Sequence, residues 1–349
     1  MSWTHRRRWT SAIVCGASLI LAATACSSGK DSGSPASAPQ HDTGSISLVY
    51  AQKQGDQEYF IDEADGAKAK AKALGVDLKV VDLGNDANKA VTEVQNAVNQ
   101  KANGVIAVVP DPSVGPQVVQ LAKAGGLAFL TSDDQVCTNG PDPSKCGKEN
   151  LVPRVGFSGQ QMGQQVGTSA GQLFKQAGWK PEDTAIVDAW QQDVTVCTDR
   201  VKANETAFKT AAGADVKTIE VGTDNTPSDA QNKISATVAG NRSVKHWVVM
   251  GCNDENVSGG VAAIQNAGFS ADNVIGVGLG AYLACKEWRG GKPTGFKAAL
   301  WINGQDVGSL AVQTMYDYLK NGKAMPAEVF APTKMVDASN WQQSGMTCS

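Results

Sequence analysis

The feature that most constrains this chain is a repeated alternation between short apolar runs and longer amphipathic stretches. Segment 244–280 shows it clearly, because apolar runs at 247–250 and 274–277 flank a polar turn at 251–254 and a helix-like stretch at 256–267. Short apolar runs separated by helices are typical of parallel strands that are buried on both faces. The pattern therefore predicts strand, helix and strand, the unit of a doubly wound α/β sheet.

The same alternation begins at residue 45 and starts again at residue 155. It predicts strands at 46–51, 78–81, 105–109, 128–131, 184–188, 216–221 and 296–301, and helices at 57–74, 87–100, 114–124, 161–176, 196–211, 228–239 and 307–319. Two similar α/β halves with short connections predict a two-lobed protein that has a cleft between its lobes.

The N-terminal segment has the composition of an export signal. Arg6, Arg7 and Arg8 precede a short apolar stretch at 12–25, which ends in small residues before Cys26. This order is similar to a bacterial lipoprotein signal peptide, residues 1–25, with Cys26 as the lipidated residue. A plain secretory signal with a free Cys26 is the alternative. Residues 26–44 are rich in Ser, Gly and Pro, and we expect them to form a flexible tether.

Composition and motifs argue against several classes of function. The formal net charge of −3 gives no basic footprint for nucleic acid. Only His246 lies outside the signal and tether, and it begins a predicted strand, which is the wrong end for a crevice site. No nucleophile elbow, Walker loop or zinc-protease motif occurs. The sequence therefore favours binding over catalysis, with no cofactor and no metal.

Six cysteines follow Cys26, and an even number in an exported chain predicts disulfides. Cys137 and Cys146 bracket one short loop, so we expect these two to pair. The other four, which can pair in three ways, are Cys197, Cys252, Cys285 and Cys348. Their spacing does not match a zinc site.

Polar and aromatic side chains follow several predicted strands. The candidates are Lys53, Gln57, Tyr59 and Phe60 after the first strand, Asp133 and Asp134 after the fourth, Arg200 in a later helix, and Asn253 and Asp254 after strand 247–250. The carboxyl ends of parallel strands face the crevice in which α/β folds bind ligands. Charged groups there hydrogen-bond hydroxyl groups, and aromatic rings offer apolar faces to sugar C–H groups. Each residue alone is also explained by a helix cap or a surface ion pair.

From residue 46 to about 319 the chain resembles the type I periplasmic binding proteins of bacterial ABC sugar importers. The resemblance rests on VKHW, GCND, GGV and VIGVG within 244–279, on PDPSVG at 110–115, and on SDDQ at 132–135. Within that family the pattern is most similar to the L-arabinose-binding branch. It implies two doubly wound parallel-sheet lobes joined by three hinge crossovers, residues 45–157 with 301–330 and residues 158–300 with 331–349.

The resemblance also implies roles for individual residues. Lys53 matches a lysine that bonds sugar hydroxyls, and Asp134, with Asp133 beside it, matches the carboxylate on the anomeric hydroxyl. Arg200 matches an arginine on the ring oxygen, and Asn253 matches an asparagine that reaches the sugar from the second lobe. We expect these residues to grip a small polyhydroxylated solute on lobe closure.

Several family positions differ here, and the differences predict a changed specificity. Gln57 replaces a glutamate, Tyr59 replaces a stacking tryptophan, and Phe157 and Cys252 replace two methionines. Gly280 and Leu283 stand where the family has an asparagine and an aspartate. A buried hydroxyl left without its partner costs roughly 1–3 kcal/mol, so we expect a monosaccharide or polyol other than L-arabinose. Trp301 is expected to fill the freed space or to stack on the ligand.

The resemblance further places Cys197 one turn before Arg200 and Cys252 beside Asn253, so a disulfide between them would lie at the pocket wall. Cys285 would then pair with Cys348. The implied function is that of a substrate-binding lipoprotein of an ABC transporter, anchored at the outer face of the cytoplasmic membrane. Its expected partners are a permease and its ATPase, and we expect a monomer. The alternative is a sensory sugar receptor that presents ligand to a membrane kinase or chemoreceptor.

Overall fold

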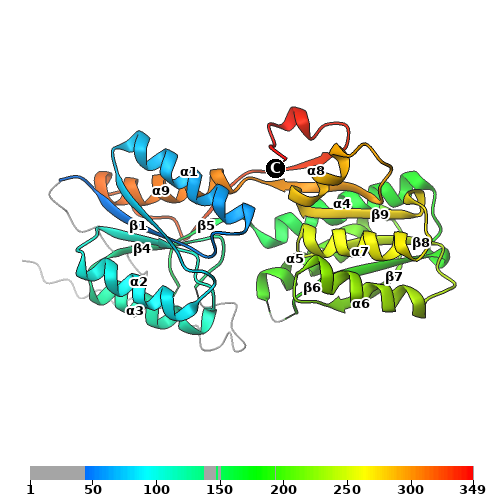
Figure 1. Cartoon of the computed structure of the whole chain (residues 1–349), viewed down its shortest axis with the longest axis horizontal. Helices are drawn as coiled ribbons and strands as arrows, with labels where there is room; N and C mark the ends of the chain where they lie inside the picture. Colours follow the sequence, from blue (N-terminus) through cyan, green and yellow to red (C-terminus); the bar gives the residue numbers. More distant parts are fainter. Residues whose placement is uncertain (1–43, 137–146, 148–150, 193, 349) are drawn as a thin grey trace, which may run out of the picture. The chain divides into compact units, whose positions relative to one another are not determined.

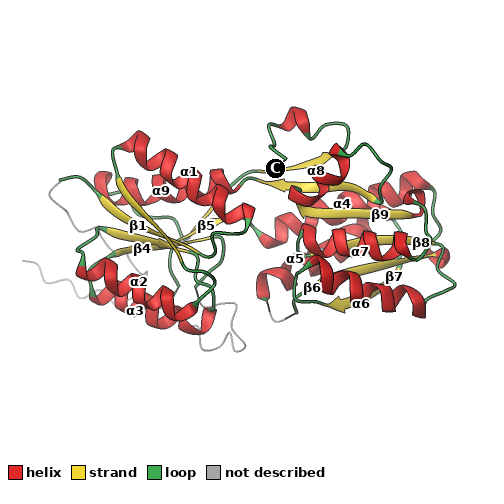
Figure 2. Cartoon of the chain, viewed as in Figure 1, coloured by secondary structure: helices red, strands yellow, loops and turns green. Residues whose placement is uncertain are grey.

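The computed structural model describes residues 44–136, 147, 151–192 and 194–348. The predicted signal peptide, Cys26, almost all of the tether and the pair Cys137 and Cys146 lie outside these residues. Two six-stranded sheets, each covered by helices on both faces, make up the described chain (Figures 1 and 2). This architecture confirms the predicted fold class. Within the described residues, no helix combines the length and apolar character needed to cross a membrane.

The first sheet is entirely parallel and has the strand order β11-β5-β4-β3-β1-β2. Its strands are β1 (Ser47–Gln52), β2 (Asp77–Asp82), β3 (Gly104–Ala107), β4 (Ala128–Ser132), β5 (Arg154–Gly156) and β11 (Glu328–Phe330). The helices around it are α1 (Glu58–Leu74), α2 (Ala87–Asn99), α3 (Gly115–Ala124) and α9 (Gly304–Asn321). Alternate residues of β1 enter different cores, because Leu48 packs with α1 and α9 residues and Val49 packs with α2 and α3 residues.

The second sheet has the strand order β12-β10-β9-β8-β6-β7. Its strands are β6 (Thr184–Trp190), β7 (Lys217–Gly222), β8 (His246–Gly251), β9 (Val274–Gly280), β10 (Phe296–Ile302) and β12 (Thr333–Asp337). Its helices are α4 (Gly159–Ala177), α5 (Thr195–Ala212), α6 (Pro227–Gly240), α7 (Asp254–Asn266) and α8 (Tyr282–Arg289). Only β12 runs antiparallel to its neighbour, β10.

Within the part of the chain that the structure describes, the chain passes between the two sheets three times: from β5 to α4, from β10 to α9, and from β11 to β12. The second passage is visible in the packing, because α9 follows a strand of the second sheet yet packs on α1 and β4 of the first. The passages fall near the lobe limits expected from the sequence, which we keep as the proposed boundaries.

Glycines on α4 set the position of α5. Gly163, Gly167 and Gly171 recur once per turn, and a Cβ atom at these residues would collide with the backbone oxygens of Arg200, Asn204 and Phe208 respectively. The missing side chains let the two helix backbones approach closely. The first turns of α5, which carry a predicted ligand residue, are therefore held directly against α4.

Helix α8 and the strands β5, β11 and β12 were not predicted from the sequence. Helix α8 has only eight residues, and β11 and β12 are short strands with exposed positions. The predicted parallel strands and the longer helices are all present, with ends that differ by a few residues.

Candidate functional site

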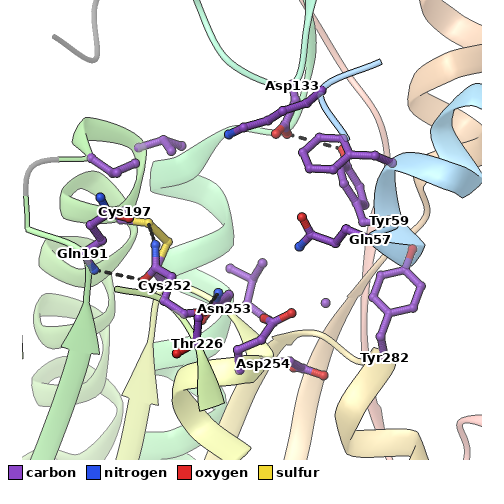
Figure 3. Close-up of a pocket in the computed structure, with 18 of the residues that line it drawn as sticks. Gln57, Tyr59, Asp133, Gln191, Cys197, Thr226, Cys252, Asn253, Asp254 and Tyr282 are labelled. Atoms are coloured by element: carbon purple, nitrogen blue, oxygen red, sulfur yellow. Dashed lines mark hydrogen bonds between the residues drawn. A yellow bond between two sulfur atoms is a disulfide. The ribbon is translucent and has the colours of Figure 1, made fainter. Parts of the chain in front are cut away.

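A cavity of about 620 Å³ lies where the carboxyl ends of strands from both sheets meet. Residues after β1 and β4 line one side, and residues after β6, β7, β8 and β9 line the other. Figure 3 shows this pocket with its polar side chains directed toward a common space. Its position is the one expected for a ligand site in open α/β sheets.

Most of the predicted site residues line this cavity. They are Lys53, Gln57, Tyr59, Phe60, Asp133, Asp134, Arg200, Cys252, Asn253 and Gly280. The structure thus brings together residues that are up to 227 positions apart in the sequence (Lys53 to Gly280). What each one contributes depends on its contacts within the protein.

Phe157 and Trp301 do not line the cavity, contrary to expectation. Phe157 is only 2% exposed and packs in the core, with its ring centroid 6.4 Å from that of Tyr59. Trp301 alternates with its neighbour Ile302 along β10, and Ile302 is the residue that lines the cavity. Trp301 packs instead against the core on the other face of the second sheet.

A carboxylate on the first sheet lies close to both expected cations. The Tyr59 hydroxyl donates a hydrogen bond to Oδ1 of Asp133 at 3.3 Å. Burial raises the pKa of Asp133 to about 6, the neighbouring Asp134 carboxylate also raises it, and the charges of Arg200 and Lys53 lower it. Three of the residues expected to grip the ligand, Lys53, Asp134 and Arg200, therefore act electrostatically on Asp133.

The backbone around Asp133 is held in an unusual conformation. Its φ angle is +63°, in the left-handed region that residues with a Cβ rarely adopt. Nη1 of Arg154 donates hydrogen bonds to the carbonyl oxygens of Asp133, at 2.7 Å, and of Phe157, at 3.1 Å. Arg154 therefore fixes the strand end that presents Asp133 to the cavity.

On the same side, Lys53 and Gln57 keep polar groups available. The Lys53 ammonium lies 5.8 Å from the centroid of the Phe60 ring, a cation–π distance that orients it. Gln57 is the N-cap residue of α1, but its side chain makes no capping hydrogen bond. Its amide lies at the cavity (Figure 3).

A disulfide between Cys197 and Cys252 forms part of the opposite wall (Figure 3). This is the pairing expected from the sequence, and Cys285 pairs with Cys348 as expected. Nη1 of Arg200 donates to the Cys252 carbonyl oxygen at 3.2 Å and lies 3.5 Å from the Cys252 Sγ. Among the described residues, the buried Nε of Arg200 has no hydrogen-bond partner. The guanidinium is anchored on one side through Nη1, and because it carries five N–H donors it can also donate to a ligand at the cavity.

Asn253 caps a helix and also lines the cavity. Its Oδ1 accepts hydrogen bonds from the backbone N–H of Asn256 at 3.0 Å and from Nδ2 of Asn256 at 2.6 Å, so it caps α7. Its Nδ2 donates to the carbonyl oxygen of Asn225 at 3.1 Å. An amide carries two N–H donors, so one remains for a ligand.

Several lining residues were not predicted. They are Gln191 after β6, Asp224, Asn225 and Thr226 after β7, and Tyr282 on α8. The loop after β7 also follows the carboxyl end of a parallel strand, which is the signal that places its residues at the cavity. These residues supply further polar groups to the second-sheet side of the cavity.

Two further carboxylates enter the cavity at the start of α7. Asp254 is only 2% exposed, and its Oδ2 accepts hydrogen bonds from the backbone N–H groups of Leu283 and Ala284 at 2.9 and 3.1 Å. Burial raises the pKa of Asp254 to about 6, although these backbone hydrogen bonds lower it. Burial, with the Asp254 charge beside it, raises the pKa of Glu255 to about 7.

His246, the one histidine outside the predicted signal and tether, has a packing role. The His246 ring stacks on Trp179 at the start of β8, with ring centroids 4.5 Å apart. Across residues 44–136, 147, 151–192 and 194–348, no cluster of three or more His, Cys, Asp or Glu side chains could hold a metal ion.

Comparison with known proteins gives consistent results. A model of the periplasmic binding protein domain matches residues 48–324. An ABC transporter L-arabinose-binding periplasmic protein of Azospirillum brasilense is 28% identical over 302 residues, which cover 85% of this chain and 88% of that one. Two solved structures share the fold at lower identity. The ribose ABC transporter protein of Conexibacter woesei has a TM-score of 0.72, 17% identity, and coverage of 89% of this chain and 96% of its own. A solute-binding protein of Actinobacillus succinogenes with bound D-allose has a TM-score of 0.70 and 18% identity, and the match covers 85% of this chain and 99% of that one.

Proposed function

Because the chain belongs to the periplasmic binding protein family, whose members are exported solute-binding proteins and not enzymes, we propose that it binds a monosaccharide or related polyol in the described cavity. The observation that carries this proposal is the presence of Lys53, Asp133, Asp134 and Arg200 around one space. The similarity to a protein named for L-arabinose, and the fold shared with proteins named for ribose and D-allose, support the ligand class.

The lining suits a hydroxylated ligand because it offers both kinds of hydrogen-bonding group. The Lys53 ammonium and the Arg200 guanidinium donate, and the carboxylates of Asp133 and Asp134 accept. A sugar hydroxyl does both, and hydrogen bonds to charged groups are the stronger ones. The Tyr59 ring adds an apolar surface at the same cavity.

The charge balance of the lining narrows the ligand class further. Two cationic side chains, Lys53 and Arg200, face a larger set of carboxylates: Asp56, Asp133, Asp134, Asp224, Asp254 and Glu255. An anionic sugar would meet unfavourable charge in this space. We therefore propose a neutral ligand and not a sugar acid or sugar phosphate.

We further propose that the protein delivers its ligand to an ABC permease and its ATPase from the outer face of the cytoplasmic membrane. Lipidation of Cys26 and a flexible tether through residue 44 would hold the folded lobes near that permease. Closure of the two lobes about the three passages of the chain would trap the ligand.

The direct test is a thermal-shift panel of L-arabinose, D-ribose, D-allose, 2-deoxy-D-ribose, xylitol, myo-inositol and D-glucuronate. A ligand present at about 1,000 times its Kd adds about 4 kcal/mol to the free energy of unfolding. We expect a neutral member other than L-arabinose to give the largest shift and D-glucuronate to give none. A response to L-arabinose alone would refute the changed specificity, and no response to any neutral member would refute the ligand class.

A matched pair of variants on α5 tests the site itself. Arg200→Ala removes the anchored guanidinium and should abolish the thermal shift. Lys202→Ala removes an exposed charge on the same helix that lies outside this cavity, so it should retain the shift. Equal responses from the two variants would contradict the assignment of Arg200.

A further inference from the structure

One residue on the second-sheet side of the cavity, Asn225, contacts Asn253 directly and also contacts the disulfide that adjoins Arg200. Asn225 lies in the loop between β7 and α6 and lines the cavity. Its φ angle is +64°, a conformation that asparagine tolerates better than most residues with a Cβ. The backbone N–H of Asn225 donates to Oγ1 of Thr223 at 3.2 Å, which holds this turn.

The side chain of Asn225 joins three separate segments. Its Oδ1 accepts hydrogen bonds from the backbone N–H of Gln191 after β6, at 2.9 Å, and from Nδ2 of Asn256 on α7, at 2.8 Å. Its Nδ2 contacts the Cys197 Sγ on α5 at 3.6 Å. An amide oxygen has two lone pairs, so the acceptor capacity of Asn225 is already used inside the protein.

These contacts lead to the two residues expected to grip the ligand from this side. The carbonyl oxygen of Asn225 accepts the hydrogen bond from Asn253, and the Cys197–Cys252 disulfide continues to the carbonyl that anchors Arg200. The disulfide is nearly inaccessible, since its cysteines are 3% and 2% exposed. The network therefore links Asn225 to both groups through part-buried hydrogen bonds and a buried disulfide.

We propose that Asn225 is a positioning residue that, together with the Cys197–Cys252 disulfide, holds Arg200 and Asn253 in a binding-ready arrangement before any ligand enters. This inference rests on the proposed function, because it assumes that these two residues contact a sugar or polyol. Groups held in place before binding lose less conformational entropy when the ligand arrives. Ligand affinity should therefore depend on a residue whose own acceptor atoms are not available to the ligand.

Variants at this position separate positioning from stability. Asn225→Gly keeps access to a positive φ and deletes the amide, whereas Asn225→Asp keeps an acceptor for the Gln191 N–H. Lys101→Gly is the matched control, because Lys101 also has a positive φ, +56°, and is exposed far from the cavity. We expect Asn225→Gly to weaken binding of the most stabilising panel compound about tenfold, the size of one lost hydrogen bond, and Lys101→Gly to leave it unchanged.

Hydrogen exchange of the ligand-free protein gives a readout that needs no sugar. In Asn225→Gly the amides of Gln191 and Asn256 should exchange about tenfold faster, because the first loses its acceptor and the second depends on the Asn253 side chain. Asn225→Asp should restore protection at Gln191, and Lys101→Gly should not change either amide.

The possible outcomes distinguish the two proposals. Wild-type exchange rates in Asn225→Gly would overturn the positioning role, and so would wild-type affinity in that variant. Faster exchange with no panel compound bound to the wild-type protein would support the positioning role and refute the proposed ligand class. A Tm lowered equally by Asn225→Gly and Asn225→Asp, with unchanged protection in both, would also overturn the inference.

Discussion

Removal of each disulfide in turn separates a local effect on the cavity from a general effect on stability. Cys197–Cys252 and Cys285–Cys348 join residues 55 and 63 positions apart. In the loop-entropy description these separations correspond to about 4.2 and about 4.3 kcal/mol. The double variants Cys197→Ser/Cys252→Ser and Cys285→Ser/Cys348→Ser should therefore lose nearly the same free energy of unfolding.

Their effects on ligand binding should differ. Only the first disulfide lines the cavity and carries the carbonyl that anchors Arg200. Loss of one organised, charge-assisted hydrogen bond costs roughly 1.5–3 kcal/mol, which corresponds to a rise in Kd of about 10- to 150-fold. The second disulfide joins α8 to the chain end, so its removal should change the Kd by less than about threefold.

Urea unfolding and isothermal titration calorimetry measure the two quantities on the same samples. Urea midpoints and slopes give the free energy of unfolding, and titration with the most stabilising panel compound gives the Kd. A similar loss of affinity in both variants would refute the argument, because it would show that stability and not the cavity wall controls binding. Unchanged affinity in both would refute it as well.

Three further predictions concern packing, pH and location. Gly163→Ala should lower the free energy of unfolding by about 1–3 kcal/mol in urea, because a Cβ there collides with the backbone of α5; wild-type stability would contradict the close helix contact. Burial raises the pKa of Asp254 from 3.8 to about 6. Between these two pH values the folded protein keeps a proton on Asp254 that the unfolded chain has already lost. The free energy of unfolding should therefore fall by up to about 3 kcal/mol as the pH rises from about 4 to about 6. Urea unfolding across this range should show a shallower fall in Asp254→Asn, and an unchanged slope would argue against it. Cys26→Ala should move the protein from the membrane fraction to the soluble fraction on immunoblots, whereas equal partition of variant and wild type would exclude lipidation as the anchor.

The fold was predictable because its signals are local. Buried parallel strands such as β8 are continuous apolar runs, and glycines end α1, α4 and α5. Most of the cavity was predictable for a related reason, since residues after parallel strands converge at one edge of each sheet. Lys53, Asp133 and Asn253 follow that rule.

The missed elements depend on contacts between distant residues. Helix α8 begins after Ala281, which gives no capping side chain, and its first N–H groups are satisfied by Asp254, about 30 residues earlier. No local N-cap signal could reveal that helix. The side chain of Asn225 likewise meets partners from three segments, none adjacent in sequence.

The two predicted site residues that do not line the cavity show how transfer from a family pattern depends on side-chain direction. Phe157 is placed at a strand end, but its side chain is buried in the core beside Tyr59. Trp301 is one residue away from a lining position, and the alternation along β10 turns it to the other face. A shift of one residue on a strand is enough to remove a side chain from a cavity.

Native mass spectrometry of the protein purified from its own host tests the central claim most directly. The cavity should retain a small molecule, and gentle dissociation should release one neutral monosaccharide or polyol per chain, absent from the Arg200→Ala variant. Release of an anionic sugar, a peptide or a lipid from the wild-type protein would contradict the assignment of this cavity to a neutral polyhydroxylated solute.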